Sequence, residues 1–162
     1  MSNADAPAAA VSDGPEGIGG WLVLPILGLI LTPLGGLFQL GQLADVKEAL
    51  AYLTQAQIAF LVIETVLSVA IVIVLPIVLL VLVFRKKRAF PRFYVIWAVL
   101  CLLFIVGDLL VLQALFKDFF AAGGVDIVDQ ETLKDIGRAV ALVAIWVPYM
   151  LNSRRVRNTF TK

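Results

Sequence analysis

Three ionisable residues interrupt long apolar runs of the chain: Glu64, Asp108 and Arg138. A charged side chain at the centre of a bilayer costs about 2.5–3.5 kcal/mol on insertion scales, so such residues usually face the protein interior and pair with one another. We therefore expect the three to form an intramembrane charge cluster in which Arg138 bridges Asp108 and Glu64 lies nearby.

Three interpretations of this cluster remain open. It can be a structural clasp that determines the order of the helices. It can be a proton or cation site, because two acids around one arginine can titrate as a unit. The three side chains can also extend separately to interfacial water.

The composition restricts other kinds of chemistry. The chain has no histidine, which excludes histidine-ligated haem, the usual zinc sites and a nucleophile activated by histidine. The only cysteine, Cys101, lies in an apolar run and is expected to be a small packing residue. Thr65, Ser68 and Ser153 have no recognisable base or oxyanion partner. We expect no enzymatic activity, no metal and no cofactor.

The elements that position these residues are predicted to be membrane-spanning helices. Of 162 residues, 61% are hydrophobic and 15% are charged, whereas globular domains are about half apolar and a quarter charged. Residues 58–84 form the longest apolar run, well above the roughly 20 residues that a transmembrane helix needs. Further spans are predicted at residues 18–40, 93–116 and 133–151. The predicted fold class is all-α: a polytopic membrane protein with an antiparallel up-down bundle of four transmembrane helices.

The predicted domain organisation is simple. Residues 1–16 are rich in Ala, Asp, Pro and Ser and are expected to be a disordered tail. Residues 17–162 form the membrane domain and end in a basic tail at residues 152–162. Residues 42–57 are amphipathic and can form either a short interfacial helix or the protruding start of the second span. Because no proline or glycine separates them from Ile58, a continuous helix is compatible with the sequence.

Local signals within the spans concern helix packing and helix ends. Gly28, Thr32 and Gly36 are spaced four residues apart and place small side chains on one helix face, a pattern typical of closely packed membrane helices. Pro76 is expected to kink the second span. Asp129 is expected to cap the start of the last helix.

The distribution of basic residues predicts the orientation in the membrane. Lysine and arginine near span ends favour the cytoplasmic side. With four spans, the loop between the second and third spans and the C-terminal tail share one side; their basic residues are Arg85, Lys86, Lys87, Arg88, Arg92, Arg154, Arg155, Arg157 and Lys162. Both termini are therefore predicted to be cytoplasmic. The tail can serve topology and contact anionic lipid, or it can bind a cytoplasmic partner.

Two segments carry a family resemblance. The first span opens with Gly19-Gly20-Trp21-Leu22, and the last closes with Trp146-x-Pro148-Tyr149-x-x-Asn152-Ser153-x-Arg155-Val156-x-Asn158-Thr159-Phe160. Together they resemble the bacterial membrane-protein family of domain of unknown function 2569 (DUF2569). The resemblance implies a four-helix protein of the bacterial inner membrane, and it implies no established activity, substrate or cofactor.

The same resemblance directs attention to a cytoplasmic-face motif. Its expected members are Trp21, Tyr149, Ser153, Arg155, Thr159 and Phe160. We expect Trp21 to pack near Tyr149 or Phe160 and Arg155 to bind helix-end carbonyls. Such an interface can be a functional surface, or it can be a latch with which the tail seals one end of the bundle.

Two functions are compatible with these features. The first is a non-enzymatic membrane component that binds lipid or a partner protein. The alternative is a small transporter or channel that uses Glu64, Asp108 and Arg138. Four spans leave little room for a pore in one copy, so the alternative requires a homo-oligomer, formed through the small-residue face. The expected partners are the lipid bilayer and either another membrane protein or further copies of the same chain; the net charge of +1 gives no reason to expect nucleic acid.

Overall fold

The computed structural model describes residues 16–42, 49–124 and 127–161. Within these ranges every regular element is a helix and no strand occurs. The predicted all-α fold class is therefore confirmed.

The helical elements of the described residues form four long segments and two short helices, η3 and α7. In chain order they are η1 (Gly20–Leu22), α1 (Val23–Gln42), η3 (Ala49–Tyr52), α2 (Gln55–Ser68), η4 (Val69–Val74), α3 (Leu75–Phe84), α4 (Phe90–Gly123), α5 (Gln130–Ala141), η5 (Leu142–Trp146), α6 (Val147–Asn152) and α7 (Arg154–Thr159). The elements η4 and η5 are π-helical. Each continues directly into its neighbours, so α2–η4–α3 and α5–η5–α6 are two uninterrupted helical segments.

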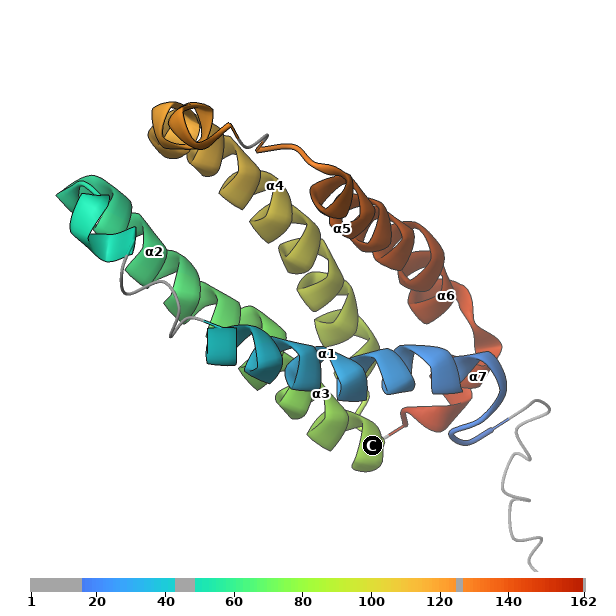
Figure 1. Cartoon of the computed structure of the whole chain (residues 1–162). Coiled ribbons are helices and arrows are strands. Elements are labelled where there is room, and N and C mark those ends of the chain that lie inside the picture. The colour runs from blue at the N-terminus through green and yellow to red at the C-terminus, as the bar shows by residue number, and fades with distance from the viewer. Residues whose placement is uncertain (1–15, 43–48, 125–126, 162) are drawn as a thin grey trace, which may run out of the picture.

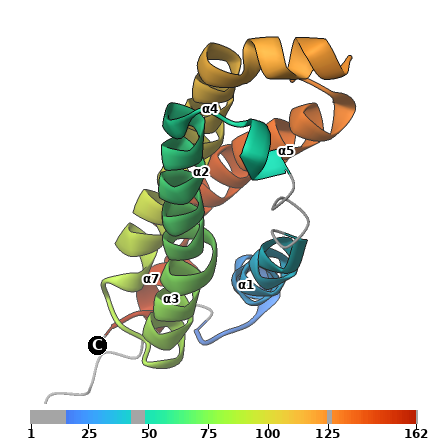
Figure 2. The same cartoon turned by 60° about the vertical axis from the view of Figure 1, so that its left-hand side comes forward.

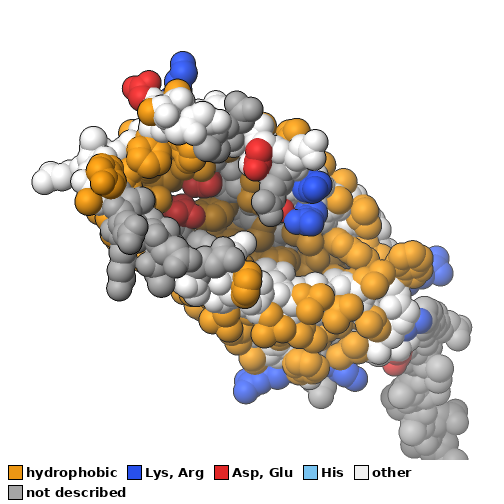
Figure 3. Space-filling view, viewed as in Figure 1, with side chains coloured by type: hydrophobic (Ala, Val, Ile, Leu, Met, Phe, Trp, Pro, Cys, Tyr) orange, Lys and Arg blue, Asp and Glu red, His pale blue; other side chains and the backbone are white. Residues whose placement is uncertain are grey.

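Three of these segments are long and apolar enough to cross a membrane. They comprise Gly20–Gly41, Gln55–Phe84 and Phe90–Gly123, with 22, 30 and 34 residues in the described part of the chain. Large apolar side chains such as Val66, Leu103 and Phe38 are exposed on their outer faces, and Figure 3 shows how much of the surface is apolar. Soluble proteins rarely expose apolar area on this scale, so these faces are suited to lipid.

The long segments converge at one end of the molecule and separate toward the other (Figure 1). We call them the closed end and the open end. The closed end holds the start of α1, the turn between α3 and α4, and α7. The helix α1 crosses α3 obliquely, and the last turns of α4 bend sideways at the open end (Figure 2). The segment α5–η5–α6 returns along α4 from the open end to the closed end.

The apolar core lies in the closed half. The buried cluster consists of Leu22, Ile26, Leu29, Leu79, Val83, Phe90, Tyr94, Trp97, Ala98, Met150, Val156 and Phe160. None of these residues comes from α2, from α5 or from the second half of α4. Packing therefore holds the closed end together and leaves the open end less filled.

Helix starts follow local capping chemistry. The side chain of Thr54 accepts a hydrogen bond from the Gln57 amide, and the Gln57 side chain accepts one from the Thr54 amide, which forms a capping box. This cap begins α2 and separates it from η3, so of the two alternatives for residues 42–57 the helix continuous with the second span is wrong. Residues 43–48 of that stretch lie outside the described ranges. Asp129 caps α5 as predicted, because its carboxylate accepts from the Thr132 amide at 2.8 Å.

The small residues predicted to form one packing face of α1 do not all lie against another helix. A Cβ at Gly36 would lie 2.9 Å from Cγ1 of Val72 and 3.1 Å from Cγ1 of Ile73, so α1 packs tightly on η4 at this point. A Cβ at Gly28 would meet no described atom within 4 Å. The hydroxyl of Thr32 donates to the Gly28 carbonyl at 2.8 Å. Of the two glycines, only Gly36 is a close-packing position within the described chain.

This difference gives a matched test of the α1–η4 contact. Gly36→Leu is expected to destabilise the protein by about 1–3 kcal/mol, because the added side chain overpacks a filled contact. Gly28→Leu adds the same side chain where there is space, so its thermal unfolding midpoint in detergent should stay close to that of the wild type. Equal midpoints for the two variants would contradict the packing described here.

Candidate functional site

The open end contains a cavity of about 520 Å³ between α1, α2–η4, α4 and α5. Figure 3 shows it as a hollow in one face of the molecule with acidic side chains inside. Its walls are largely apolar, and its polar lining residues are Thr32, Gln39, Glu64, Ser68, Cys101, Asp108, Thr132, Asp135 and Arg138. The cavity therefore combines an apolar interior with a small group of acids and hydroxyls.

All three charged residues singled out from the sequence line this cavity. The predicted bridge between Arg138 and Asp108 is nevertheless wrong. Arg138 forms its salt bridge with Asp135, at 2.6 Å, one turn earlier on α5. Pairing between residues i and i+3 on one helix needs no approach of two helices, which explains why the local acid is preferred.

The carboxylate of Asp108 has an unusual environment for a charged group. Its Oδ1 atom is buried and has no hydrogen-bond partner among the described residues. Glu64 of α2 lines the same cavity. Most buried polar atoms in native proteins are hydrogen-bonded, so an orphaned oxygen beside a second acid favours a ligand that donates hydrogen bonds or carries positive charge.

The two π-helical segments contribute to the cavity wall, through Ile71 and Val72 of η4 and Leu142 of η5. Each is followed by a proline at the second position of the next helix, Pro76 in α3 and Pro148 in α6. Proline has no amide hydrogen and cannot complete the bond to the carbonyl four residues earlier. The kink predicted at Pro76 is thus accommodated by a widened π turn beside the cavity.

Trp97 stabilises one of these π segments from the neighbouring helix. Its indole Nε1–H donates to the Ile71 carbonyl at 2.9 Å, and its side chain is nearly fully buried. In hydrocarbon a free carbonyl has no water to bind, so this hydrogen bond connects α4 to η4 at the base of the cavity.

The closed end brings together the first and last segments of the described chain. The Gly17 amide donates to Oγ1 of Thr159 at 3.0 Å. The guanidinium of Arg155 lies against Gly19 and Gly20: a Cβ at Gly19 would lie 3.1 Å from one of its nitrogens. Gly20 also adopts φ +56°, where glycine is favoured. Gly20 is therefore favoured by its backbone conformation, and Gly19 leaves room for the docked Arg155 side chain.

The apolar members of the two motifs pack differently from the prediction. Trp21 is 71% exposed, so its expected packing against Tyr149 or Phe160 is wrong. Its neighbour Leu22 is fully buried instead, in the same cluster as Phe160. The ring of Phe160 lies 4.6 Å from that of Phe90, centroid to centroid. The side of η1 that faces the core is therefore the one that carries Leu22.

The remaining motif residues have local roles. Tyr149 packs edge-on against Trp146, with ring centroids 5.8 Å apart. Ser153 stands at the N-cap of α7, and its side chain forms no capping hydrogen bond. Arg155 packs on the glycine backbone, where helix-end carbonyls had been the expected partners.

Comparison with known proteins confirms the family resemblance that these two segments carry. The sequence profile of the family "Protein of unknown function (DUF2569)" matches residues 15–161. The chain belongs to the DUF2569 family. Searches for similar characterised proteins and for similar solved structures found no match.

For this DUF2569 protein, sequence reasoning missed three contributions to the cavity. Trp97, Ser68 and Cys101 line it beside the acids, yet each occupies an apolar run in which a packing role is the default expectation. Spacing offered one signal: Trp97, Cys101 and Asp108 lie on one face of a helix, at intervals of four and seven residues. Among the described residues, no group of three His, Cys, Asp or Glu side chains is placed to hold a metal ion.

The tryptophan hydrogen bond can be tested by Trp97→Phe. The variant keeps an aromatic ring but leaves the Ile71 carbonyl unpaired, so the free energy of unfolding should fall by about 1 kcal/mol or more. Trp146→Phe is the control, because its indole N–H has no hydrogen-bond partner among the described residues. Thermal unfolding in detergent measures both, and a loss no larger for Trp97→Phe than for the control would contradict the assigned bond.

The docked tail can be tested by Thr159→Val. The substitution preserves the shape of the side chain but removes the oxygen that accepts from Gly17, at an expected cost of about 1 kcal/mol. The undocked tail should become roughly five-fold more populated, and trypsin cleavage after Arg157 should accelerate to a similar extent. Thr161→Val serves as the control, and identical cleavage rates for the two variants would argue against the contact.

Proposed function

We propose that this protein is a non-enzymatic, multi-pass membrane protein that binds the cationic group of an amphiphile in the cavity at its open end. The observation that carries the proposal is the buried, unpartnered Oδ1 of Asp108, beside Glu64, in a cavity with apolar walls. An ammonium group supplies both the positive charge and the hydrogen-bond donors that these carboxylates lack.

The depth of the acids supports an amphiphile. At 1.5 Å per residue, Glu64 lies about 30 Å from the end of α3 and Asp108 about 27 Å from the start of α4. The hydrocarbon core of a bilayer is roughly 30 Å thick. If the closed end lies at one surface of the membrane, the carboxylates lie near the opposite boundary of the hydrocarbon. A lipid-like molecule places its charged head at that level and its chain among apolar walls.

The proposed topology has four spans, the fourth being α5–η5–α6. Three apolar segments alone would place the two ends of the domain on opposite sides of the membrane, whereas Gly17 and Thr159 are hydrogen-bonded to each other. The basic residues of the α3–α4 turn and of the tail favour a cytoplasmic closed end. We place the protein in the bacterial inner membrane with both termini cytoplasmic.

A small transporter or channel for a cation or proton is the second candidate. The specific observation in its favour is that two π segments, on separate helical segments, border the same acid-lined cavity. π turns occur frequently at functional sites. Cation flux into reconstituted vesicles that disappears in Glu64→Gln would favour transport over binding alone.

Binding can be measured by native mass spectrometry of the full chain released from neutral detergent, with dodecylamine and dodecanoic acid as matched probes. The wild type should retain the amine, and the two carboxylates of the open-end cavity should be needed for the amine and not for any retention of the acid. The double variant Glu64→Gln, Asp108→Asn should retain the amine at least about ten-fold more weakly, because charge-assisted hydrogen bonds are lost. Asp118→Asn, an exposed acid of α4 outside the cavity lining, should bind as the wild type does.

The same variants distinguish binding from a structural clasp. Because Asp108 has no described cationic partner, Asp108→Asn should leave the thermal midpoint unchanged or raise it. A lower midpoint for Asp108→Asn would favour the clasp. Retention of dodecylamine by the double variant at the wild-type level would overturn the proposed function.

A further inference from the structure

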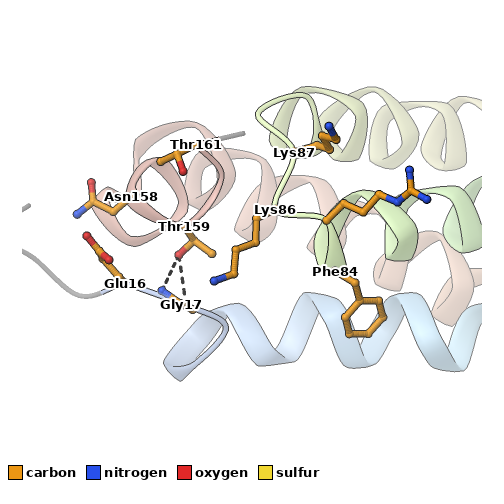
Figure 4. Close-up of a pocket in the computed structure, with 9 residues that line it drawn as sticks. Glu16, Gly17, Phe84, Lys86, Lys87, Asn158, Thr159 and Thr161 are labelled. Atoms are coloured by element: carbon orange, nitrogen blue, oxygen red, sulfur yellow. Dashed lines mark hydrogen bonds between the residues drawn. The ribbon is translucent and has the colours of Figure 1, made fainter.

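A second cavity lies at the closed end, far from the acid-lined one. It measures about 530 Å³ and is bordered by three separate segments: the N-terminal approach to α1, the α3–α4 turn and the C-terminal tail. Among the described residues, its lining contains three cations, Arg85, Lys86 and Lys87, and one acid, Glu16. Figure 4 shows these side chains around the cavity, with Lys86 directed toward Gly17 and Thr159.

Lys86 adopts a backbone conformation that disfavours it. Its φ is +50°, and among the described residues it alone has a positive φ without being a glycine. The Lys86 amide donates to the Val83 carbonyl and the Lys87 amide to the Leu82 carbonyl, at 2.9 and 3.0 Å. This is the hydrogen-bond pattern of a Schellman motif, in which the left-handed position is usually glycine.

The backbone at position 86 favours glycine, and the residue found there differs from glycine by its lysine side chain. No described carboxylate forms a salt bridge with Lys86, Lys87 or Arg85. Strained residues persist at binding sites where the side chain is needed. Here the strain places an unpaired ammonium group inside a cavity.

We propose that this closed-end cavity binds the phosphate of an anionic phospholipid headgroup. The three cations attract a phosphate, and the side chains of Asn158 and Thr161 add hydrogen-bond donors to the lining. Phe84 also borders the cavity and is largely exposed at the end of the apolar helix α3. An apolar rim beside a cationic cavity suits a headgroup whose acyl chains remain in the bilayer, more than it suits a free anion.

The site couples lipid binding to tail docking. Thr159, which accepts from Gly17, lines the cavity, and Arg88 of the same turn donates to the Thr161 carbonyl at 2.7 Å. A bound phosphate neutralises the positive charges that the turn and the tail bring together. This proposal concerns a different cavity from the amphiphile site and does not depend on it.

The deciding variant is Lys86→Gly, which removes the ammonium group and supplies the residue that the backbone favours. Full-length protein in neutral detergent is titrated with dioctanoyl phosphatidylglycerol, dioctanoyl phosphatidylcholine or inorganic phosphate, and the thermal unfolding midpoint is recorded. Phosphatidylglycerol should raise the wild-type midpoint. In Lys86→Gly the unliganded midpoint should be equal or higher, while the apparent affinity for phosphatidylglycerol falls about five-fold or more.

Arg92→Gln is the matched control, because it removes a cation at the same end outside the cavity lining and should retain wild-type affinity. Equal losses in Arg92→Gln and Lys86→Gly would indicate diffuse surface attraction and overturn the site. No shift of the wild-type midpoint with phosphatidylglycerol, or an equal shift with phosphatidylcholine, would do the same. An equal shift with inorganic phosphate alone would overturn the assignment to a lipid.

Discussion

Within hydrocarbon, a backbone N–H or C=O group has no water to bind, and this constraint shapes the whole structure. Each long apolar segment remains helical throughout, even where a proline interrupts the regular hydrogen bonds. At Pro76 and Pro148 the preceding turns widen into π helix, and at η4 the indole of Trp97 donates to the Ile71 carbonyl. The two widened turns border one cavity, so the feature that accommodates proline also helps to form a binding space.

The molecule has one end held by packing and one end left open. At the closed end, Leu22, Phe90 and Phe160 join a single apolar cluster, and α7 folds back to meet Gly17. At the open end, the segments separate around a cavity that contains the acids. The open-end cavity can therefore change shape around a ligand while the closed end stays packed, because few side chains of the buried cluster also line that cavity.

The two cavities differ in charge and therefore in the ligands that suit them. Among the charged residues that line the open-end cavity, three are acids and one is an arginine, whereas three cations and one acid line the described part of the closed-end cavity. In a bilayer crossed by the three long segments, the two cavities would lie toward opposite surfaces. A cationic amphiphile on one side and an anionic headgroup on the other would then contact the same helices, α2–η4–α3 and α4.

The sequence by itself determined the helical class, three apolar segments long enough to cross a membrane, the Asp129 cap and the presence of Glu64 and Asp108 within two of those segments, because these depend on local composition and spacing. It also indicated that the opening glycine motif and the basic tail belong together. Only the tertiary structure decided that Arg138 pairs with Asp135, that Leu22 rather than Trp21 is buried, and that Oδ1 of Asp108 has no hydrogen-bond partner in the described part of the chain. These outcomes depend on the rotation and tilt of each helix, which follow from the π turns, the Gly36 contact and the docked tail, and no single segment encodes them.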